Sequence, residues 1–128
     1  MKTVPADEHI RRVRLAKARQ FKAVADDALE LAPDGSDVAD AVVTLLIHAG
    51  IAAADALCAK ELQVHAKGDS HKDSTRLVSS INPAAGQHLK RLLDMKTRAG
   101  YGHDPVSATQ LQQAERSASF LLSLANTT

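Results

Sequence analysis

The segment from Ala41 to Ala59 constrains the fold most, because its residues would be apolar on nearly every side of a helix. A helix of this kind is buried on most of its sides. It must therefore lie at the centre of a bundle, or contribute in addition to a subunit interface. Its polar exceptions, Thr44, His48 and Asp55, fall on one stripe. Buried polar groups need hydrogen-bond partners, so we expect a small network between helices there, with a functional cleft as the alternative.

Apolar residues at helical spacing predict the remaining helices. We expect long helices from about Asp7 to Leu31, Val38 to Ala66 and Pro83 to Arg98, a last helix that begins after Ser107, and a short helix from Asp73 to Ser80. No segment has the pattern of a strand. The predicted fold is all-α, an up-and-down bundle of four main helices plus one short helix, forming a single domain over residues 1–128.

Helix boundaries follow from residues with known capping preferences. Asp37 is the expected N-cap of the second helix, and Gly68 the expected signal for its end. Asn82 followed by Pro83 predicts the start of the third long helix. Ser107 and the glutamine three residues later form a capping box that opens the last helix.

The first helix carries an apolar face and a run of basic residues. We expect the apolar face to turn inward; its members are Ile10, Val13, Phe21, Val24, Ala28 and Leu31. Lys17 interrupts this face, so we expect it either to extend its amine to water or to pair with Asp55. The basic run shares an outward arc formed by Arg11, Arg12, Arg14, Arg19 and Lys22. A solvated surface is the favoured interpretation; the alternative is contact with a phosphate backbone, for which Arg11, Arg12 and Arg19 are the candidates.

Composition excludes several classes of function. The formal charge is +1, so no overall field attracts nucleic acid or an anionic membrane. A single cysteine, Cys58, allows no internal disulfide, and the N-terminus has no apolar signal core; both favour a cytoplasmic location. Polar residues interrupt the longest apolar stretch, so we expect no membrane span. The six histidines lack metal-ligand spacing, and no cofactor motif is present, so we predict neither a metal nor a cofactor.

The segment Arg98-Ala-Gly-Tyr-Gly-His103 is the most informative for function. An arginine offers a rigid fork of donors to a phosphate, and a histidine transfers protons near neutral pH. Together they can cleave RNA without a metal, the histidine acting on an oxygen and the arginine stabilising negative charge on phosphorus.

This segment and its context resemble the HEPN superfamily of small helical bundles. Members often carry an arginine followed after four to six residues by a histidine where the third long helix meets the last. The pattern Ala52-Ala-Ala-Asp-Ala-Leu57 is similar to their alanine-rich second helix, and Ala114-Glu-Arg-Ser-Ala118-Ser-Phe120-Leu to their last helix. The resemblance covers roughly residues 37 to 125.

The resemblance implies two functions. Many HEPN proteins are metal-independent endoribonucleases that act as homodimers, often as toxins paired with a nucleotidyltransferase-like antitoxin. Here Arg98 would stabilise the phosphate and His103 would be the general acid and base. Ala99, however, stands where active members usually have a polar residue, and an arginine followed three residues later by an aromatic is typical of members without clear nuclease activity. In that alternative Tyr101 packs or stacks in a module that binds RNA, a nucleotide or a protein. A third hypothesis is a purely structural interaction bundle.

Overall fold

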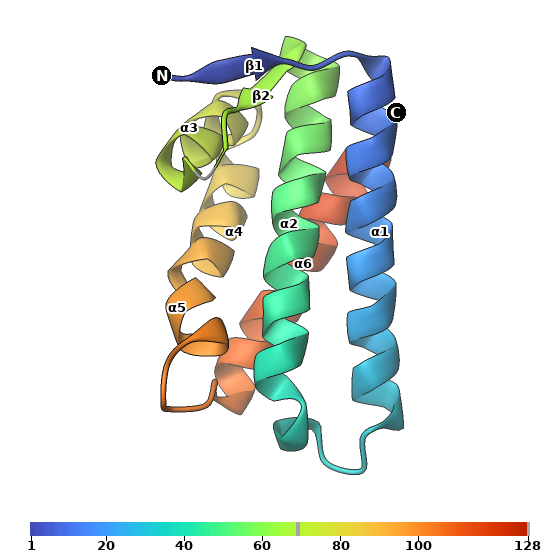
Figure 1. The fold of residues 1–128 in the computed structure, drawn as a ribbon, viewed down its shortest axis with the longest axis vertical. Helices are drawn as coiled ribbons and strands as arrows, with labels where there is room; N and C mark the ends of the chain where they lie inside the picture. Colours follow the sequence, from blue (N-terminus) through green and yellow to red (C-terminus); the bar gives the residue numbers. More distant parts are fainter. Residues whose placement is uncertain (69, 128) are drawn as a thin grey trace.

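The computed structural model describes residues 1–68 and 70–127. It confirms the predicted fold class, an all-α bundle (Figure 1). The elements that run up and down the bundle are α1 (Glu8–Leu31), α2 (Ala39–Leu62), α4 (Pro83–Asp94) continued by α5 (Lys96–Gly100), and α6 (Ala108–Asn126). The shorter elements are η1 (Gly35–Asp37), α3 (His71–Ile81), β1 (Thr3–Pro5) and β2 (Val64–Ala66).

A small antiparallel sheet joins the N-terminus to the chain after α2. Thr3 lies opposite Ala66 and Pro5 opposite Val64, so the prediction that no segment forms a strand is wrong. Three residues are too few to show the alternating pattern of a strand, and their pairing depends on contacts distant in sequence. Helix α2 also ends earlier than predicted, because Gln63 adopts a left-handed conformation with φ 56° and turns the chain into β2.

Helix α2 is the centre of the bundle, as its sequence predicts. It packs against α1, α3, α4, α5 and α6, and every residue from Ala52 to Ala59 is buried. Gly50 allows this packing, since a Cβ there would collide with the side chain of Leu92. By length and composition alone, α2 also satisfies the requirements of a membrane span, although we expected its polar residues to exclude one. In the bundle, 67% of that apolar window is buried, which is equally typical of a core helix.

Helix α1 turns inward a face that coincides only in part with the predicted one. Ile10, Phe21 and Ala28 are half-buried, and Ala28 packs against the core. Val13, Val24 and Leu31 are exposed, whereas the buried residues are Leu15, Ala18 and Ala25. Alanines allow the backbones of α1 and α2 to approach closely, and the three exposed side chains remain outside. Lys17 lies on this exposed side, so its charge needs no buried partner.

Two of the predicted caps form, and one does not. The Ser107 capping box is present, and the Asn82 side chain accepts a hydrogen bond from Ala85 N at 3.0 Å. Asp37 does not cap α2; it lies in η1, and Val38 occupies the N-cap position without a side-chain hydrogen bond. The single helix predicted from Pro83 to Arg98 is interrupted at Met95, which separates α4 from α5.

Candidate functional site

The turn after α5 presents the residues of the predicted motif. The backbone N–H groups of Tyr101 and Gly102 both donate to the carbonyl oxygen of Thr97, at 2.9 and 2.8 Å. A Cβ on Gly102 would lie 3.1 Å from the Cα of Arg98, so this close approach favours glycine. Further along, the N–H of buried Val106 donates to Asp40 Oδ1 at 2.9 Å. The loop is therefore held at both ends.

All three predicted residues of this turn are exposed to solvent. Tyr101 is 80% exposed, and Arg98 and His103 are exposed as well. Arg98 Nη1 lies 3.4 Å from Gln110 Oε1, the oxygen that also accepts from Ser107 N at 2.8 Å. His103 forms no hydrogen bond or ion pair within the described part of the chain. A purely structural role predicts a buried Tyr101 and an ion-paired Arg98. Tyr101 is exposed instead, and among the described residues Arg98 has no ion pair.

A cleft of about 200 Å³ lies between α2 and α5, beside this turn. Its walls are formed by Thr44, Ile47 and His48 of α2, and by Lys96, Gly100 and Tyr101. The cleft thus combines the exposed phenol ring of Tyr101 with one cationic side chain, that of Lys96. Sequence reasoning singled out Tyr101 but missed Lys96, because only the packing of α5 against α2 places it at this cleft.

The polar stripe of α2 does not form the single network that we expected. Thr44 and His48 instead line the cleft, as the functional alternative predicts. The Thr44 hydroxyl donates to the carbonyl oxygen of Asp40 at 2.8 Å, and the His48 ring centre lies 5.6 Å from that of Phe21. Asp55 has a separate partner on another helix. The three side chains therefore make separate contacts, and exposed His48 keeps its ring in reach of solvent.

Asp55 is paired with Arg14 rather than with Lys17. Its Oδ2 accepts hydrogen bonds from Arg14 Nε at 3.1 Å and Nη2 at 2.7 Å. Arg14 is thus turned toward α2, and its predicted outward orientation is wrong. Burial raises the pKa of the Asp55 carboxyl, and the neighbouring charges of Arg14 and His65 oppose this rise without overcoming it.

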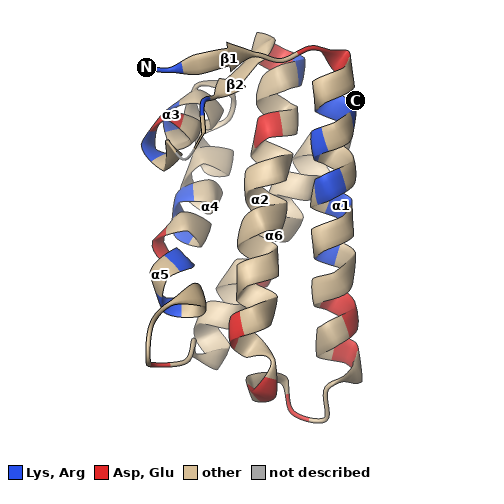
Figure 2. Cartoon of the chain, in the orientation of Figure 1, with Lys and Arg blue, Asp and Glu red and all other residues tan. Residues whose placement is uncertain are grey.

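The other basic residues of α1 lie apart from the turn. Arg11 forms an ion pair with Glu8, and Arg19 donates to Asn126 Oδ1 from Nε and Nη2 at 3.0 and 2.6 Å. Arg12 is exposed. Figure 2 shows that α1 and α5 lie on opposite sides of α2. One copy of the chain therefore does not bring Arg11, Arg12 and Arg19 together with Arg98.

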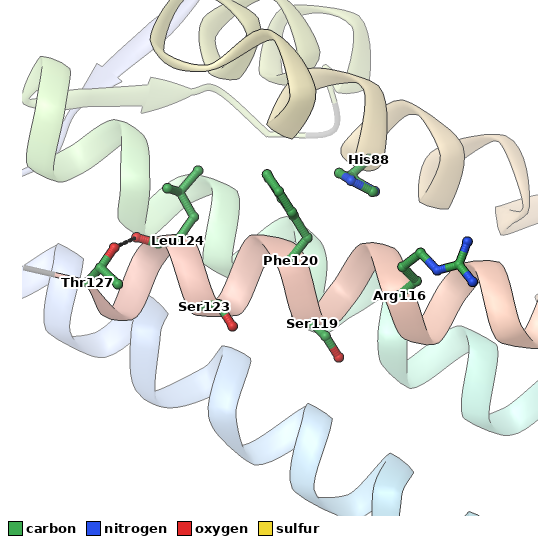
Figure 3. A pocket seen from close by; sticks show the side chains of 7 residues that line it. All are labelled: His88, Arg116, Ser119, Phe120, Ser123, Leu124 and Thr127. Atoms are coloured by element: carbon green, nitrogen blue, oxygen red, sulfur yellow. Dashed lines mark hydrogen bonds between the residues drawn. The ribbon is translucent and has the colours of Figure 1, made fainter.

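A larger, mostly apolar groove of about 580 Å³ runs along α6 beside α4 (Figure 3). His88 of α4 stacks on Phe120 of α6 with ring centres 4.4 Å apart, and its Nδ1 lies 3.0 Å from the hydroxyl of buried Ser117. Burial lowers the pKa of His88, and the charges of Arg91 and Arg116 lower it further. None of the predicted site residues lines this groove.

The described residues offer no metal site, and the one cysteine is buried. Within residues 1–68 and 70–127, no group of three or more histidine, cysteine or acidic side chains is placed to hold a metal ion. Cys58 is 2% exposed, and burial together with the charge of Asp55 raises the pKa of its thiol to about 12.

No protein-family model matches the chain, and no curated protein matches its sequence. The fold and the site therefore define a small helical bundle with an aromatic and cationic cleft beside an Arg/Tyr/His turn.

Proposed function

We propose that this chain is a HEPN-like protein that binds single-stranded RNA at the turn after α5. The observation that carries the proposal is Tyr101, an aromatic side chain that is 80% exposed at the edge of a cleft containing Lys96. The other two aromatic residues, Phe21 and Phe120, are partly buried in the bundle. An exposed ring beside cations is the arrangement that stacks an unpaired base and holds its phosphates.

Each side chain of the site has a part in this binding. Tyr101 provides the stacking surface, and Lys96 and Arg98 provide charges for the adjacent phosphates. Thr44 and His48 line the same cleft from α2 and limit the size of the base that enters. Gly102 and Asp40 position the loop without touching the ligand.

Binding of a fluorescent RNA of about six nucleotides, followed by anisotropy, tests the proposal. Stacking of one base contributes about 1–3 kcal/mol, so Tyr101→Ala should weaken binding by a factor of roughly 5 to 150. Tyr101→Phe keeps the ring and should bind like the wild type. Leu31→Ala is the control, because Leu31 is 81% exposed at the far end of α1. Absence of wild-type binding, or equal binding by Tyr101→Ala, would overturn the proposal.

Metal-independent cleavage of the bound RNA is the second candidate function. It is favoured by the exposure of both Arg98 and His103 on one short turn. Incubation with transfer RNA and mixed single-stranded RNA in EDTA should then give cyclic-phosphate ends, lost in Arg98→Ala and in His103→Ala. Cleavage that survives both substitutions would overturn the catalytic role of Arg98 and His103, and binding without any cleavage would leave the non-catalytic function.

The family resemblance adds proposals about assembly and location. As a HEPN-like protein the chain would act in the cytoplasm as a homodimer, with two copies of the Arg98 turn facing one groove. A nucleotidyltransferase-like antitoxin would be the protein partner if the chain is a ribonuclease toxin. Sedimentation of the purified chain tests the dimer, and a monomer at all concentrations would exclude a groove shared by two copies.

A further inference from the structure

Positive charge is concentrated in two parts of the molecule, the basic run of α1 and the segment of residues 71–100 (Figure 2). Residues 71–100 contain six lysine and arginine residues and two aspartates, a net charge of +4, whereas the whole chain has a net charge of +1. Figure 2 shows these basic residues in blue along α3, α4 and α5, on one side of the bundle, while acidic residues gather at the far end of α1. The small overall charge therefore conceals a local cationic surface.

A groove of about 260 Å³ runs between α3 and α4 on this surface. Lys72, Thr75 and Arg76 of α3 line one wall, and Lys90 and Asp94 are among the residues of the other. Lys90 and Asp94 neutralise each other in an ion pair of 2.8 Å. The unbalanced charge of the groove therefore comes from α3.

Lys72 and Arg76 remain available to a ligand. Both are exposed, and neither forms an ion pair or hydrogen bond with any other residue in the described parts of the chain. The nearby acid, Asp73, has other hydrogen-bond partners: the Ser70 side chain lowers the pKa of Asp73 most, and the backbone N–H of Lys2 donates to its carboxylate at 3.4 Å. The charge of Arg76 also lowers the pKa of Asp73, without a hydrogen bond or ion pair between these two described residues. Residues four apart on a helix have their Cβ atoms about 6 Å from each other, so Lys72 and Arg76 form one cationic edge.

Lys96 connects this groove to the cleft at Tyr101. Its Nζ lies 3.1 Å from Nε2 of His71, which lines the groove, while Lys96 itself lines the cleft. The groove and the cleft are therefore neighbouring parts of one surface that extends from α3 to the end of α5.

We propose that the α3–α4 groove holds the phosphate backbone of the RNA strand whose base stacks on Tyr101. Lys72 and Arg76 contact successive phosphates, and Lys96 contacts the phosphate between the groove and the cleft. This inference rests on the proposed RNA binding and extends it, because it adds a sequence-independent tract of contacts outside the Arg98 turn. A strand of about three nucleotides reaches only the cleft, whereas one of about twelve also occupies the groove.

The salt dependence of binding tests the inference with both lengths of RNA. Each phosphate contact contributes about 0.7 to the slope of log affinity against log salt for a single strand. Lys72→Gln and Arg76→Gln should each lower the slope for the long RNA by about 0.7, and the double variant by about 1.4. Binding of the short RNA should not change. Lys17→Gln on α1 is the matched control, since Lys17 is also exposed, and its slope should equal that of the wild type.

The outcomes separate this inference from the proposed function. An unchanged slope in the double variant, with binding that still depends on Tyr101, would overturn the groove and leave the cleft intact. An equal loss in Lys17→Gln would also overturn it, by showing a general effect of charge. Failure of the wild type to bind either RNA would overturn both proposals, and an acidic protein would then be the ligand to test. Circular dichroism confirms that each variant is folded.

Discussion

Replacing Arg14 by methionine should destabilise the protein in a way that depends strongly on pH. Asp55 has a side chain that is only 12% exposed, and its ionised form is held by Arg14 at 2.7 Å. Methionine keeps the apolar stem of the arginine but removes the charge and the hydrogen bonds. Loss of one member of a buried ion pair usually costs about 3–5 kcal/mol, because the remaining charge has no partner.

The cost has an upper limit that can be calculated. Without Arg14, the Asp55 carboxylate can avoid being a buried, unpaired charge by binding a proton. In the unfolded chain the same carboxyl releases that proton with a pKa of about 3.9. Keeping that proton costs about 1.4 kcal/mol for each pH unit above this value, hence at most about 4 kcal/mol at pH 7 and about 1.5 kcal/mol at pH 5. The folded-state pKa of Asp55 is already raised by burial in the wild type, and loss of the opposing charge of Arg14 raises it further in the variant. The free energy of unfolding of the Arg14→Met variant, compared with that of the wild type, is therefore greatest at low pH and falls as the pH rises.

Urea unfolding at pH 5 and pH 7, followed by circular dichroism, measures this difference. We expect Arg14→Met to lose about 3 kcal/mol at pH 7 and no more than about 1.5 kcal/mol at pH 5. Arg19→Met is the control, because Arg19 is exposed and bonds to the neutral amide of Asn126, so its small loss should not vary with pH. Adding Asp55→Ala to Arg14→Met should recover part of the loss at pH 7. Equal losses at both pH values would refute the reasoning.

Two further predictions concern the core. Gly86→Ala should destabilise the protein by about 1–3 kcal/mol in urea unfolding, because its Cβ would lie 3.0 Å from the Cα of Ser79 and collide with the Ser79 hydroxyl. Gly100→Ala faces open space and should stabilise the helix by up to about 1 kcal/mol, so an equal effect of both changes would contradict this explanation. The thiol of Cys58, with its pKa of about 12, should not react with a disulfide reagent at pH 8 until the protein is unfolded in guanidinium. Rapid reaction of the native protein would show that the α2 core opens.

The sequence alone determined the fold class because its strongest signals are local. The run from Ala41 to Ala59 is apolar on nearly all sides, a pattern typical of a helix that other helices surround. Asn82 and Ser107 are N-caps whose side chains accept hydrogen bonds from backbone N–H groups three residues later. Both helix starts therefore follow from short-range hydrogen bonds. The position of the Arg98 turn between two helices follows from the same kind of pattern, whereas its exposure is seen only in the structure and its function stays a prediction.

The tertiary structure alone decided how these helices face one another. A periodic pattern does not show which side of α1 packs against α2. In the structure the small Ala18 and Ala25 are buried there, and Val13 and Val24 are exposed. The same orientation of α1 places Arg14, and not Lys17, in an ion pair with Asp55. The strands β1 and β2 pair across about sixty residues, and Lys96 joins Tyr101 at a cleft only when α5 packs on α2. Such contacts depend on the rotation and distance of whole helices, and no local run of residues contains that information.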